Sequence, residues 1–452
     1  MAAMFNRRII NYLINWKDKK SRKPLVLRGA RQVGKTSAIL MFAEKYFKNV
    51  IYINLENIEH LRLFRQELSL QDFEDIVQIK FHKKIVPQET LVFIDEIQNS
   101  ISLIKLLRFF YEQRPDIHVI TAGSLLEAKI EKEGFSFPVG RVEFAYLYPF
   151  DFFEYLEAKK EIELLNLLQS VSPESNISEG LHHLALKIFY EYVMIGGMPE
   201  IVKAYLQNRN PDELKPIYSS LFTSYCEDVY KYSSLAEAKY LSYVIEKAPL
   251  FSGSIITYEK FGGSNFRSRE MSKAFNTLEK VMLLYQVQAT KSKELPLISQ
   301  RKRPKKLIFL DTGLINQQMN IQQEFLNLED LNGFYRGKIA EQVVGQNLLA
   351  QFEDSPARIF YWAKDKAEGS AEVDFCIPLK GMMLGIEVKS GKTGRLKSLF
   401  SFAKDVKNSS LIRIYSGNLM REEVKFEGRR FNLTSVPFYL IPRVLEESFN
   451  GF

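Results

Sequence analysis

The segment PLVLRGARQVGKTS, residues 24–37, determines the fold of the N-terminal part of the chain. Apolar residues 25–27 predict a buried strand, and apolar residues 39–43 predict a helix that begins at about Gly34. Four residues separate Gly29 from Gly34, and Lys35 and Thr36 follow, which is the spacing of a phosphate-binding loop. The alternative is a chance match in a glycine-containing loop, but the flanking strand and helix are the context that the motif requires.

Such a loop predicts a polyphosphate site, because free backbone N–H groups and the N-terminal end of a helix favour anionic oxygens. Lys35 is expected to reach the β- and γ-phosphates, and the Thr36 hydroxyl is expected to ligate Mg²⁺. We therefore expect a nucleotide and Mg²⁺ as cofactors. The expected nucleotide-binding residues are Gly29, Ala30, Arg31, Gln32, Val33, Gly34, Lys35, Thr36 and Ser37.

Three further apolar segments, at residues 50–55, 90–97 and 118–124, alternate with helical patterns. This alternation predicts a parallel sheet covered by helices on both faces. Asp95 and Glu96 end the second of these strands, at the edge of the sheet where ligands bind. We expect Asp95 to hold Mg²⁺ through water and Glu96 to polarise the attacking water. The alternative is an acidic pair that caps the next helix.

Bulk composition excludes several classes of protein. At 452 residues and 46% hydrophobic content, the chain is long enough for several folded domains and too apolar to be disordered. Its two cysteines, Cys226 and Cys376, exclude a disulfide framework and a multi-cysteine zinc site. Without an apolar run of membrane-spanning length or a signal-peptide core, we expect a cytoplasmic protein with no membrane partner. The net charge of +8 permits an anionic partner without requiring one.

The motifs GARQVGKT, LVFIDEIQ and TAGS resemble those of AAA-superfamily ATPases. They are most similar to a prokaryotic family in which this ATPase is fused to a C-terminal domain long catalogued as uncharacterised. The resemblance implies that a polar residue at the end of the fourth strand senses the γ-phosphate. Ser124, or else Thr121, stands at that place, where Asn is commoner. The sequence GGMPE, residues 196–200, is also typical of the family, and we assign it no chemistry.

The same family has a Gly-Arg pair shortly after this strand, and Gly140 and Arg141 match it. The resemblance implies that Arg141 is a γ-phosphate sensor or an arginine finger. The structural alternative is that Arg141 forms an ion pair with Glu143 or Asp151. Spacing does not decide whether Arg141 would act in cis or in trans.

From about residue 236 to residue 323 the pattern differs from that of the helical region before it. Apolar residues at helical spacing over 267–284 precede a short strand at 283–289, and the strand LIFLD ends the segment. The loop between the strands, 291–306, holds seven Lys or Arg and one Glu. This order is typical of a winged helix, and it predicts DNA binding with the helix in the major groove and the basic loop on phosphates. The alternative is a protein-contact module with a solvated loop.

An acidic set in the C-terminal region predicts a second site. Glu341 lies in a helical pattern, Asp374 in the strand AEVDFCI, and Glu387 and Lys389 in the strand LGIEVKS, on one face. The set resembles that of restriction-endonuclease-like nucleases, although Val373 replaces the proline that often precedes the Asp. The three carboxylates, Glu341, Asp374 and Glu387, suit Mg²⁺ or Mn²⁺, and Lys389 would position the nucleophile or the phosphorane. Ordinary charge alternation in an exposed strand is the alternative.

We therefore expect an α/β protein of four parts: a parallel-sheet P-loop ATPase domain (1–155), a helical lid region (156–235), a winged-helix-like domain (236–330) and a mixed α/β nuclease-like domain (331–452). The leading hypothesis is a Mg²⁺-dependent ATPase that binds DNA and cleaves it under nucleotide control. One alternative is a nucleotide switch with protein-binding modules and an inactive nuclease fold. Another is a protein-remodelling motor. A homo-oligomer or a protein partner fits each hypothesis.

Overall fold

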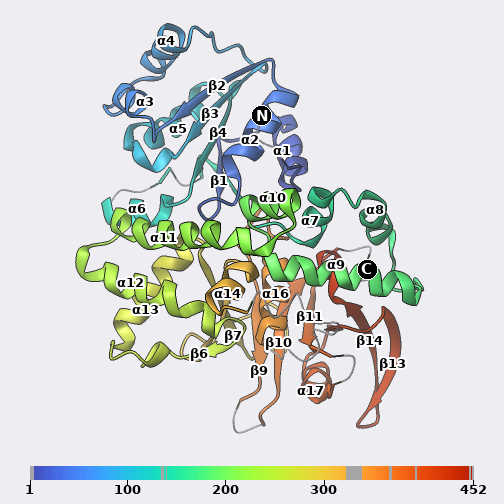
Figure 1. Cartoon of the computed structure of the whole chain (residues 1–452). Coiled ribbons are helices and arrows are strands. Elements are labelled where there is room, and N and C mark those ends of the chain that lie inside the picture. Colours follow the sequence, from blue (N-terminus) through green and yellow to red (C-terminus); the bar gives the residue numbers. More distant parts are fainter. Residues whose placement is uncertain are drawn as a thin grey trace.

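Two β-sheets with a layer of helices between them make up the computed structural model (Figure 1). It describes residues 5–133, 137–138, 140–321, 338–365, 369–391, 394–446 and 449. The expected boundary between residues 330 and 331 lies outside these ranges. Residues 21–156 contain the first sheet, and the second sheet is built from residues after 254.

The first sheet has five parallel strands in the order β2-β3-β4-β1-β5, as the alternating pattern predicts. Its strands carry apolar side chains on both faces because helices cover both. Leu25 and Leu27 pack with α1 and α2, whereas Val26 packs with α4 and α5 on the other face. The elements are α1 (Ile9–Asp18), β1 (Leu25–Arg28), α2 (Lys35–Tyr46), β2 (Asn49–Asn54), α3 (Ile58–Leu63), α4 (Leu70–Phe81), β3 (Thr90–Asp95), α5 (Ile101–Gln113), β4 (His118–Gly123), α6 (Leu126–Glu133) and β5 (Glu143–Tyr146).

The helical layer follows β5, and Figure 1 places α9, α10 and α11 between the two sheets. No helix in the described ranges is both long and apolar enough to cross a membrane. The helices of the layer are α7 (Phe152–Lys159), α8 (Ile162–Ser170), α9 (Glu179–Ile195), α10 (Pro199–Asn208), α11 (Lys215–Tyr232) and α12 (Leu235–Lys247).

The second sheet has nine strands in the order β13-β14-β12-β11-β10-β9-β7-β8-β6. Strand β7 pairs in parallel with β9, so the predicted winged-helix-like and nuclease-like segments share one continuous sheet. The remaining elements are β6 (Ile255–Ile256), α13 (Ser268–Lys280), β7 (Leu284–Thr290), β8 (Lys305–Phe309), α14 (Thr312–Gln318), α16 (Lys338–Leu349), β9 (Phe360–Ala363), β10 (Glu372–Leu379), β11 (Met382–Val388), α17 (Lys397–Asp405), β12 (Ser409–Tyr415), β13 (Met420–Phe426) and β14 (Arg429–Pro437).

The charged segment after β2 forms two helices, because α3 ends at Leu63 and Ser69 begins α4 with a capping box that includes Asp72. One expected helix differs from the structure in extent. Helix α13 ends at Lys280 rather than at 284, because Met282 has a φ of 59° that breaks the helix. The expected order of helix, strand, basic loop and strand is present as α13, β7, residues 291–304 and β8.

Candidate functional site

A cleft of about 530 Å³ opens at the phosphate-binding loop, which is within the size range of small-molecule and cofactor sites. Its walls come from the loop, from the ends of β2 and β3, from the N-terminal segment and from α10. The lining residues are Phe5, Arg7, Arg31, Gln32, Gly34, Lys35, Thr36, Ser37, Ala38, Glu56, Glu96, Phe150, Pro199, Glu200 and Lys203.

The loop is held in shape before any ligand is present. Gly34 has a φ of 92° and stands at the N-cap of α2, a conformation that favours glycine and points the first N–H groups of the helix into the cleft. Arg7 donates a 2.8 Å hydrogen bond to the carbonyl oxygen of Val33 and pairs with Glu154 at 2.8 Å. The segment that precedes α1 therefore supports the loop.

Lys35 is buried, and among the described residues its ammonium group donates hydrogen bonds to main-chain oxygens only. Nζ donates to the carbonyls of Gly29, at 3.0 Å, and Ala30, at 2.8 Å. Burial lowers the pKa of Lys35, while Glu96 and Asp95 act in the opposite direction. A phosphate group in the cleft would supply the anionic partner that this ammonium lacks.

Asp95 ends β3 beside the loop, as its place in the sequence predicted. Its Oδ2 accepts hydrogen bonds from the Thr36 hydroxyl at 2.7 Å and from the Tyr52 hydroxyl at 3.2 Å. Burial raises the pKa of Asp95, and these hydrogen bonds oppose the rise. Two hard oxygens, the Thr36 hydroxyl and the Asp95 carboxylate, thus lie together next to Lys35, and this donor set suits Mg²⁺.

Glu96 follows Asp95 and its side chain lines the cleft. Its backbone has a φ of 54°, and its carboxylate accepts a short hydrogen bond from Gln98 Nε2. Burial raises the pKa of Glu96, whereas Lys35 lowers it. A carboxylate in this position can accept a proton from water bound in the cleft.

Arg31 is tied to a helix outside the first sheet. Its guanidinium contacts both carboxylate oxygens of Asp228 on α11, at 2.6 and 2.7 Å, and Lys231 contacts the same carboxylate at 2.7 Å. Asp228 is buried. The loop therefore has a direct ionic link to the helical layer.

The three residues that the family resemblance implicated, Ser124, Thr121 and Arg141, lie outside the cleft lining. Ser124 is buried directly after β4, and Thr121 donates a 3.4 Å hydrogen bond to the carbonyl of Leu25 in the sheet. Arg141 is about 44% exposed and pairs with Glu112 of α5 at 3.0 Å, rather than with Glu143 or Asp151. Among the residues that the structure describes, neither Ser124 nor Arg141 lines the cleft beside Lys35.

Several lining residues were not predicted. Phe5 and Phe150 pack edge to face, with ring centroids 5.3 Å apart, and form an apolar wall. Pro199, Glu200 and Lys203 belong to α10, which lies outside the segment that carries the ATPase motifs. The sequence drew attention to this region only through the GGMPE segment, whose last two residues begin α10, and nothing in that segment indicated a nucleotide.

The structure brings Glu341 and Asp374 of the C-terminal acidic set together around Lys306. This lysine was expected to belong to the basic loop. Lys306 on β8 is about 1% exposed and its Nζ lies 2.6 Å from Glu341 and 3.0 Å from Asp374. It also donates to the main-chain oxygen of Asp374 at 3.2 Å. Three acceptors therefore match the three protons of this ammonium.

Glu387 and Lys389 lie on the adjoining strand end and pair with each other at 2.7 Å. Asp374 Oδ2 accepts a 2.9 Å hydrogen bond from the Val388 N–H, which ties the two strands together. Burial raises the pKa of Glu387 to about 7, and Asp374 adds to this rise. The second oxygen of Glu387 is buried and has no hydrogen-bond partner among the described residues.

These residues do not form a ready divalent-cation site. In the part of the chain that the structure describes, no three His, Cys, Asp or Glu side chains are grouped so that they could hold a metal ion. Lys306 already provides the positive charge between Glu341 and Asp374. The arrangement is a network of ion pairs with one unpartnered carboxylate oxygen, that of Glu387.

The basic loop makes contacts with the C-terminal segment. Lys291 and Arg303 both pair with Asp365 at 3.0 Å, and Arg303 also donates to the carbonyl of Lys364. Arg301 and Lys302 are exposed. Part of the predicted phosphate-binding charge is thus neutralised within the chain.

Helix α13 borders a second cleft, of about 540 Å³, together with α11, α12 and Ala128 of α6. Arg267, Arg269 and Lys273 bring positive charge to it, while Glu237 and Glu270 bring negative charge, and Lys273 pairs with Glu237. The polar side of α13, the helix that the sequence predicts to bind DNA, therefore lines this cleft.

Comparison with protein families divides the chain into three matched segments. Residues 21–156 match the model of a family described as AAA domain. Residues 186–324 match a domain of unknown function (DUF8612), and residues 336–439 match another (DUF4143). No curated protein matches the chain. The N-terminal segment is thus an AAA-type P-loop domain, and the two later families have no described activity.

Solved structures with low similarity to the chain include two other proteins. One is the RuvB Holliday junction branch migration motor of Thermotoga maritima, at 16% identity and a TM-score of 0.29, covering 63% of this chain and 90% of that chain. Another is the ORC1 protein of Aeropyrum pernix in complex with DNA, at 13% identity and a TM-score of 0.28, covering 71% and 92%. Similarities this low carry no argument about activity.

Proposed function

We propose that the chain binds and hydrolyses ATP in the cleft at residues 29–37. The observation that carries this proposal is the 2.7 Å hydrogen bond between Thr36 and Asp95 beside the buried Lys35. It joins the two halves of an ATPase site, the phosphate-binding loop and the carboxylates at the end of β3, within one cleft. The match of residues 21–156 to the AAA domain family supports the same function.

Each side chain has a role that follows from its position. Lys35 would exchange main-chain carbonyls for phosphate oxygens, and the N–H groups at the start of α2 would bind the remaining phosphate charge. Thr36 and Asp95 would hold Mg²⁺, which supplies positive charge to the phosphates. Glu96 would orient water and accept its proton.

Two substitutions test these roles separately. Lys35→Ala should abolish binding of ATP, whereas Glu96→Gln should retain binding and slow hydrolysis by about 10²–10⁴-fold, the usual contribution of a general base. Lys45→Ala, an exposed lysine on the same helix, is the matched control. Binding is measured by titration calorimetry and hydrolysis by phosphate release. Equal loss of binding in the Lys35 and Glu96 variants would contradict the assigned roles.

A second proposed function is binding of DNA by α13 and the basic loop. The observation that favours it is the charge of Arg267, Arg269 and Lys273 around one cleft, with Arg301 and Lys302 exposed on the loop. If these residues meet phosphates, affinity for duplex DNA should fall with salt at a slope of about 0.9 per contact. Arg301→Ala with Lys302→Ala should lower that slope by about two. A signal independent of salt would exclude this role.

Cleavage of DNA by the C-terminal segment is a further proposal, supported by the adjacency of Asp374, Glu387 and Lys389. Lys306 opposes it, because this residue already neutralises Asp374 and Glu341. Plasmid incubated with Mg²⁺ or Mn²⁺ should be cut by the native protein and left intact by Asp374→Ala and Lys389→Ala variants. Uncut plasmid with the native protein would favour the alternative of a nucleotide switch with an inactive nuclease fold.

A further inference from the structure

The GGMPE segment, which had no assigned chemistry, forms the turn between α9 and α10 at the edge of the nucleotide cleft. Gly196 ends α9 with a φ of 77°, and Pro199 begins α10. Pro199 and Glu200 line the cleft, and Lys203 lines it one helical turn later. The position of this wall of the cleft therefore depends on the turn, because the wall residues of α10 directly follow it.

Asp311 fixes the turn from the side of the second sheet. It is fully buried two residues after the end of β8, and its Oδ2 accepts a 2.6 Å hydrogen bond from the Gly197 N–H. Its other oxygen caps α14 by accepting the N–H groups of Gly313 and Leu314. A Cβ added at Gly196 would lie 2.0 Å from Asp311 Oδ1, so a larger residue could not replace this glycine without moving Asp311.

The same contact point includes the ATPase domain and α16. The Gly197 carbonyl accepts a 2.8 Å hydrogen bond from the Phe150 N–H, at the end of the AAA-matched segment. Gln346 on α16 donates to Asp311 Oδ2 at 3.2 Å, and its neighbour Asn347 accepts from the Phe152 N–H at 3.0 Å. One buried polar network thus joins the cleft wall, the ATPase domain and α16, and such networks fix a single geometry.

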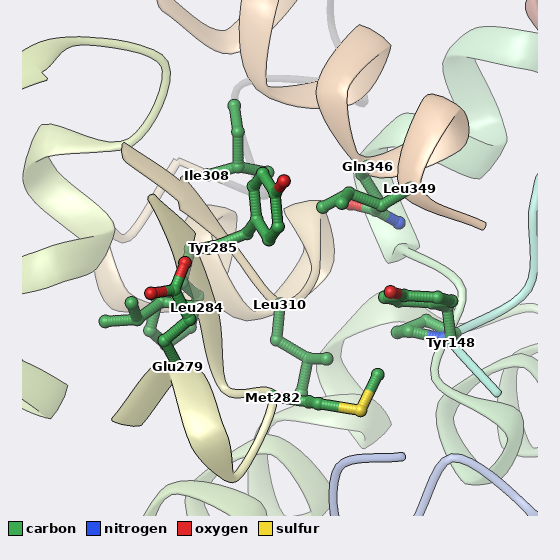
Figure 2. Close-up of a pocket in the computed structure, with 11 residues that line it drawn as sticks. Tyr148, Glu279, Met282, Leu284, Tyr285, Ile308, Leu310, Gln346 and Leu349 are labelled. Atoms are coloured by element: carbon green, nitrogen blue, oxygen red, sulfur yellow. The ribbon is translucent and has the colours of Figure 1, made fainter. Parts of the chain in front are cut away.

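Little free space surrounds this network. Figure 2 shows side chains from three parts of the chain, among them Tyr148, Tyr285 and Gln346, converging on the adjacent cavity. The cavity has a volume of about 40 Å³, which is room for water but not for a nucleotide. Because close-packed side chains transmit displacements to their neighbours, a shift of α10 would also displace α14 and α16.

Lys203 is the charged group through which α10 would respond to a bound nucleotide. Arg7 and Arg31, two other cations of the cleft, are paired with Glu154 and Asp228. Lys203 is half-buried, and no carboxylate of the described residues forms an ion pair with it. A polyphosphate in the cleft would give this ammonium an anionic partner, and charge-assisted hydrogen bonds of this kind are strong.

We propose that Lys203 contacts the phosphates of the bound nucleotide, and that the turn at residues 196–199 transmits the position of α10 through Asp311 to α14 and α16. This inference rests on the proposed nucleotide binding and adds the part of the chain that nucleotide binding would regulate. The C-terminal sheet, rather than the ATPase domain alone, then differs between the free and the nucleotide-bound protein.

The test uses the full chain with ADP, by calorimetry and by amide hydrogen exchange over residues 312–318 and 338–349. Lys203→Ala should weaken ADP binding about tenfold, whereas Lys187→Ala, an exposed lysine on α9, should bind ADP as the native protein does. In the native protein, saturating ADP should slow exchange in α14 and α16. In Lys203→Ala at saturation, this slowing should be lost. Circular dichroism confirms that each variant is folded.

Other outcomes are equally decisive. If the native protein does not bind ADP, the proposed nucleotide binding itself fails. If it binds ADP and Lys203→Ala binds equally tightly, the contact is excluded while nucleotide binding stands. If Lys203→Ala weakens binding but ADP leaves exchange in α14 and α16 unchanged in the native protein, the coupling through Asp311 is wrong. Lys203→Arg, which keeps the charge, should restore most of the affinity.

Discussion

Two buried lysines, Lys35 and Lys306, show how differently the chain treats the same charge. Lys35 stands at the nucleotide cleft and donates only to the carbonyls of Gly29 and Ala30. Lys306 stands in the second sheet and contacts the carboxylates of Glu341 and Asp374 at 2.6 and 3.0 Å. One ammonium group therefore lacks an anion, and the other has two.

The pKa shifts follow this difference. Burial lowers the pKa of Lys35. Burial also acts to lower the pKa of Lys306, but Asp374 and Glu341 outweigh it, so the net shift is upward. The comparison teaches that a buried cation marks a binding site only where its counter-charge is missing. By this criterion the first site is prepared for an anionic ligand, and the second is closed by the chain itself.

The largest expected effect is on the stability of the free protein, and it tests whether the two lysines differ in their counter-charges. Lys306→Met leaves two carboxylates buried without a counter-charge, so we expect the free energy of unfolding to fall by about 3–5 kcal/mol. The raised pKa of Lys306 keeps its ammonium charged below its ordinary pKa of 10.5, and this contribution is lost as the pH rises through the folded value. Burial raises the pKa of Glu341 to about 7, so the ion pair between Glu341 and Lys306 is fully formed between these two pH values. Urea denaturation in this alkaline window is therefore a suitable measurement.

Lys35→Met is the matched control for that measurement, because it removes a buried ammonium that has no carboxylate bound to it. The loss of two hydrogen bonds and the relief of a buried charge act in opposite directions, so we expect a change within about 1 kcal/mol. Equal destabilisation by the two substitutions would show that the two lysines are held in the same way.

The second prediction concerns ligand rather than stability of the free protein. ADP at 100 times its dissociation constant should stabilise the native chain by about 2.7 kcal/mol, because it binds only the folded state. Lys35→Met should lose this stabilisation at the same concentration of ADP, whereas a folded variant at Glu341 should keep it. Thermal unfolding with and without ADP measures both. Stabilisation that survives in Lys35→Met would place the nucleotide elsewhere.

The same two lysines show what the sequence could predict. The proposed role of Lys35 follows from its neighbours in the chain, since Gly29, Gly34 and Thr36 define the loop within eight residues. Asp95 was found because strand ends in a parallel sheet meet at one edge, which is a rule of topology. Local pattern was sufficient for the first sheet for this reason.

Lys306 could not be placed in the same way. The sequence groups it with the basic loop, and its partners Glu341 and Asp374 are 35 and 68 positions away. Only its alternation with Ile308 in the strand KKLIF indicated an inward side chain. The pairing of β7 with β9 and the contact between Gly197 and Asp311 also join distant segments, and no local pattern specifies such partners.

A smaller effect is expected at Asp228, the residue that gives Arg31 its counter-charge. Asp228→Asn would leave Arg31 free for phosphate, and we expect ADP to bind about threefold more tightly, a gain of less than 1.4 kcal/mol. Glu56→Gln is the control, since Glu56 lies 3.8 Å from Arg31 and is more exposed. Weaker binding in Asp228→Asn would mean that Asp228 orients Arg31 toward the nucleotide instead of competing with it.

The smallest effect is expected at Arg141, and it sharpens the comparison by asking whether the cleft is complete within one chain. Arg141 is exposed, pairs with Glu112 and lies outside the cleft lining, so Arg141→Ala should leave ADP affinity within about twofold of native and the melting temperature within about 1 °C.

Hydrolysis measured over a range of protein concentrations then separates the two roles that the family resemblance implies for this arginine. A loss of activity confined to high protein concentration would mean that Arg141 enters the cleft of a neighbouring copy. An equal loss at every concentration would require the segment around Gly140 to move toward Lys35 within the same chain. Unchanged hydrolysis throughout would leave Arg141 as one half of a surface ion pair, and Lys203 on α10 would then be the cation that completes the cleft.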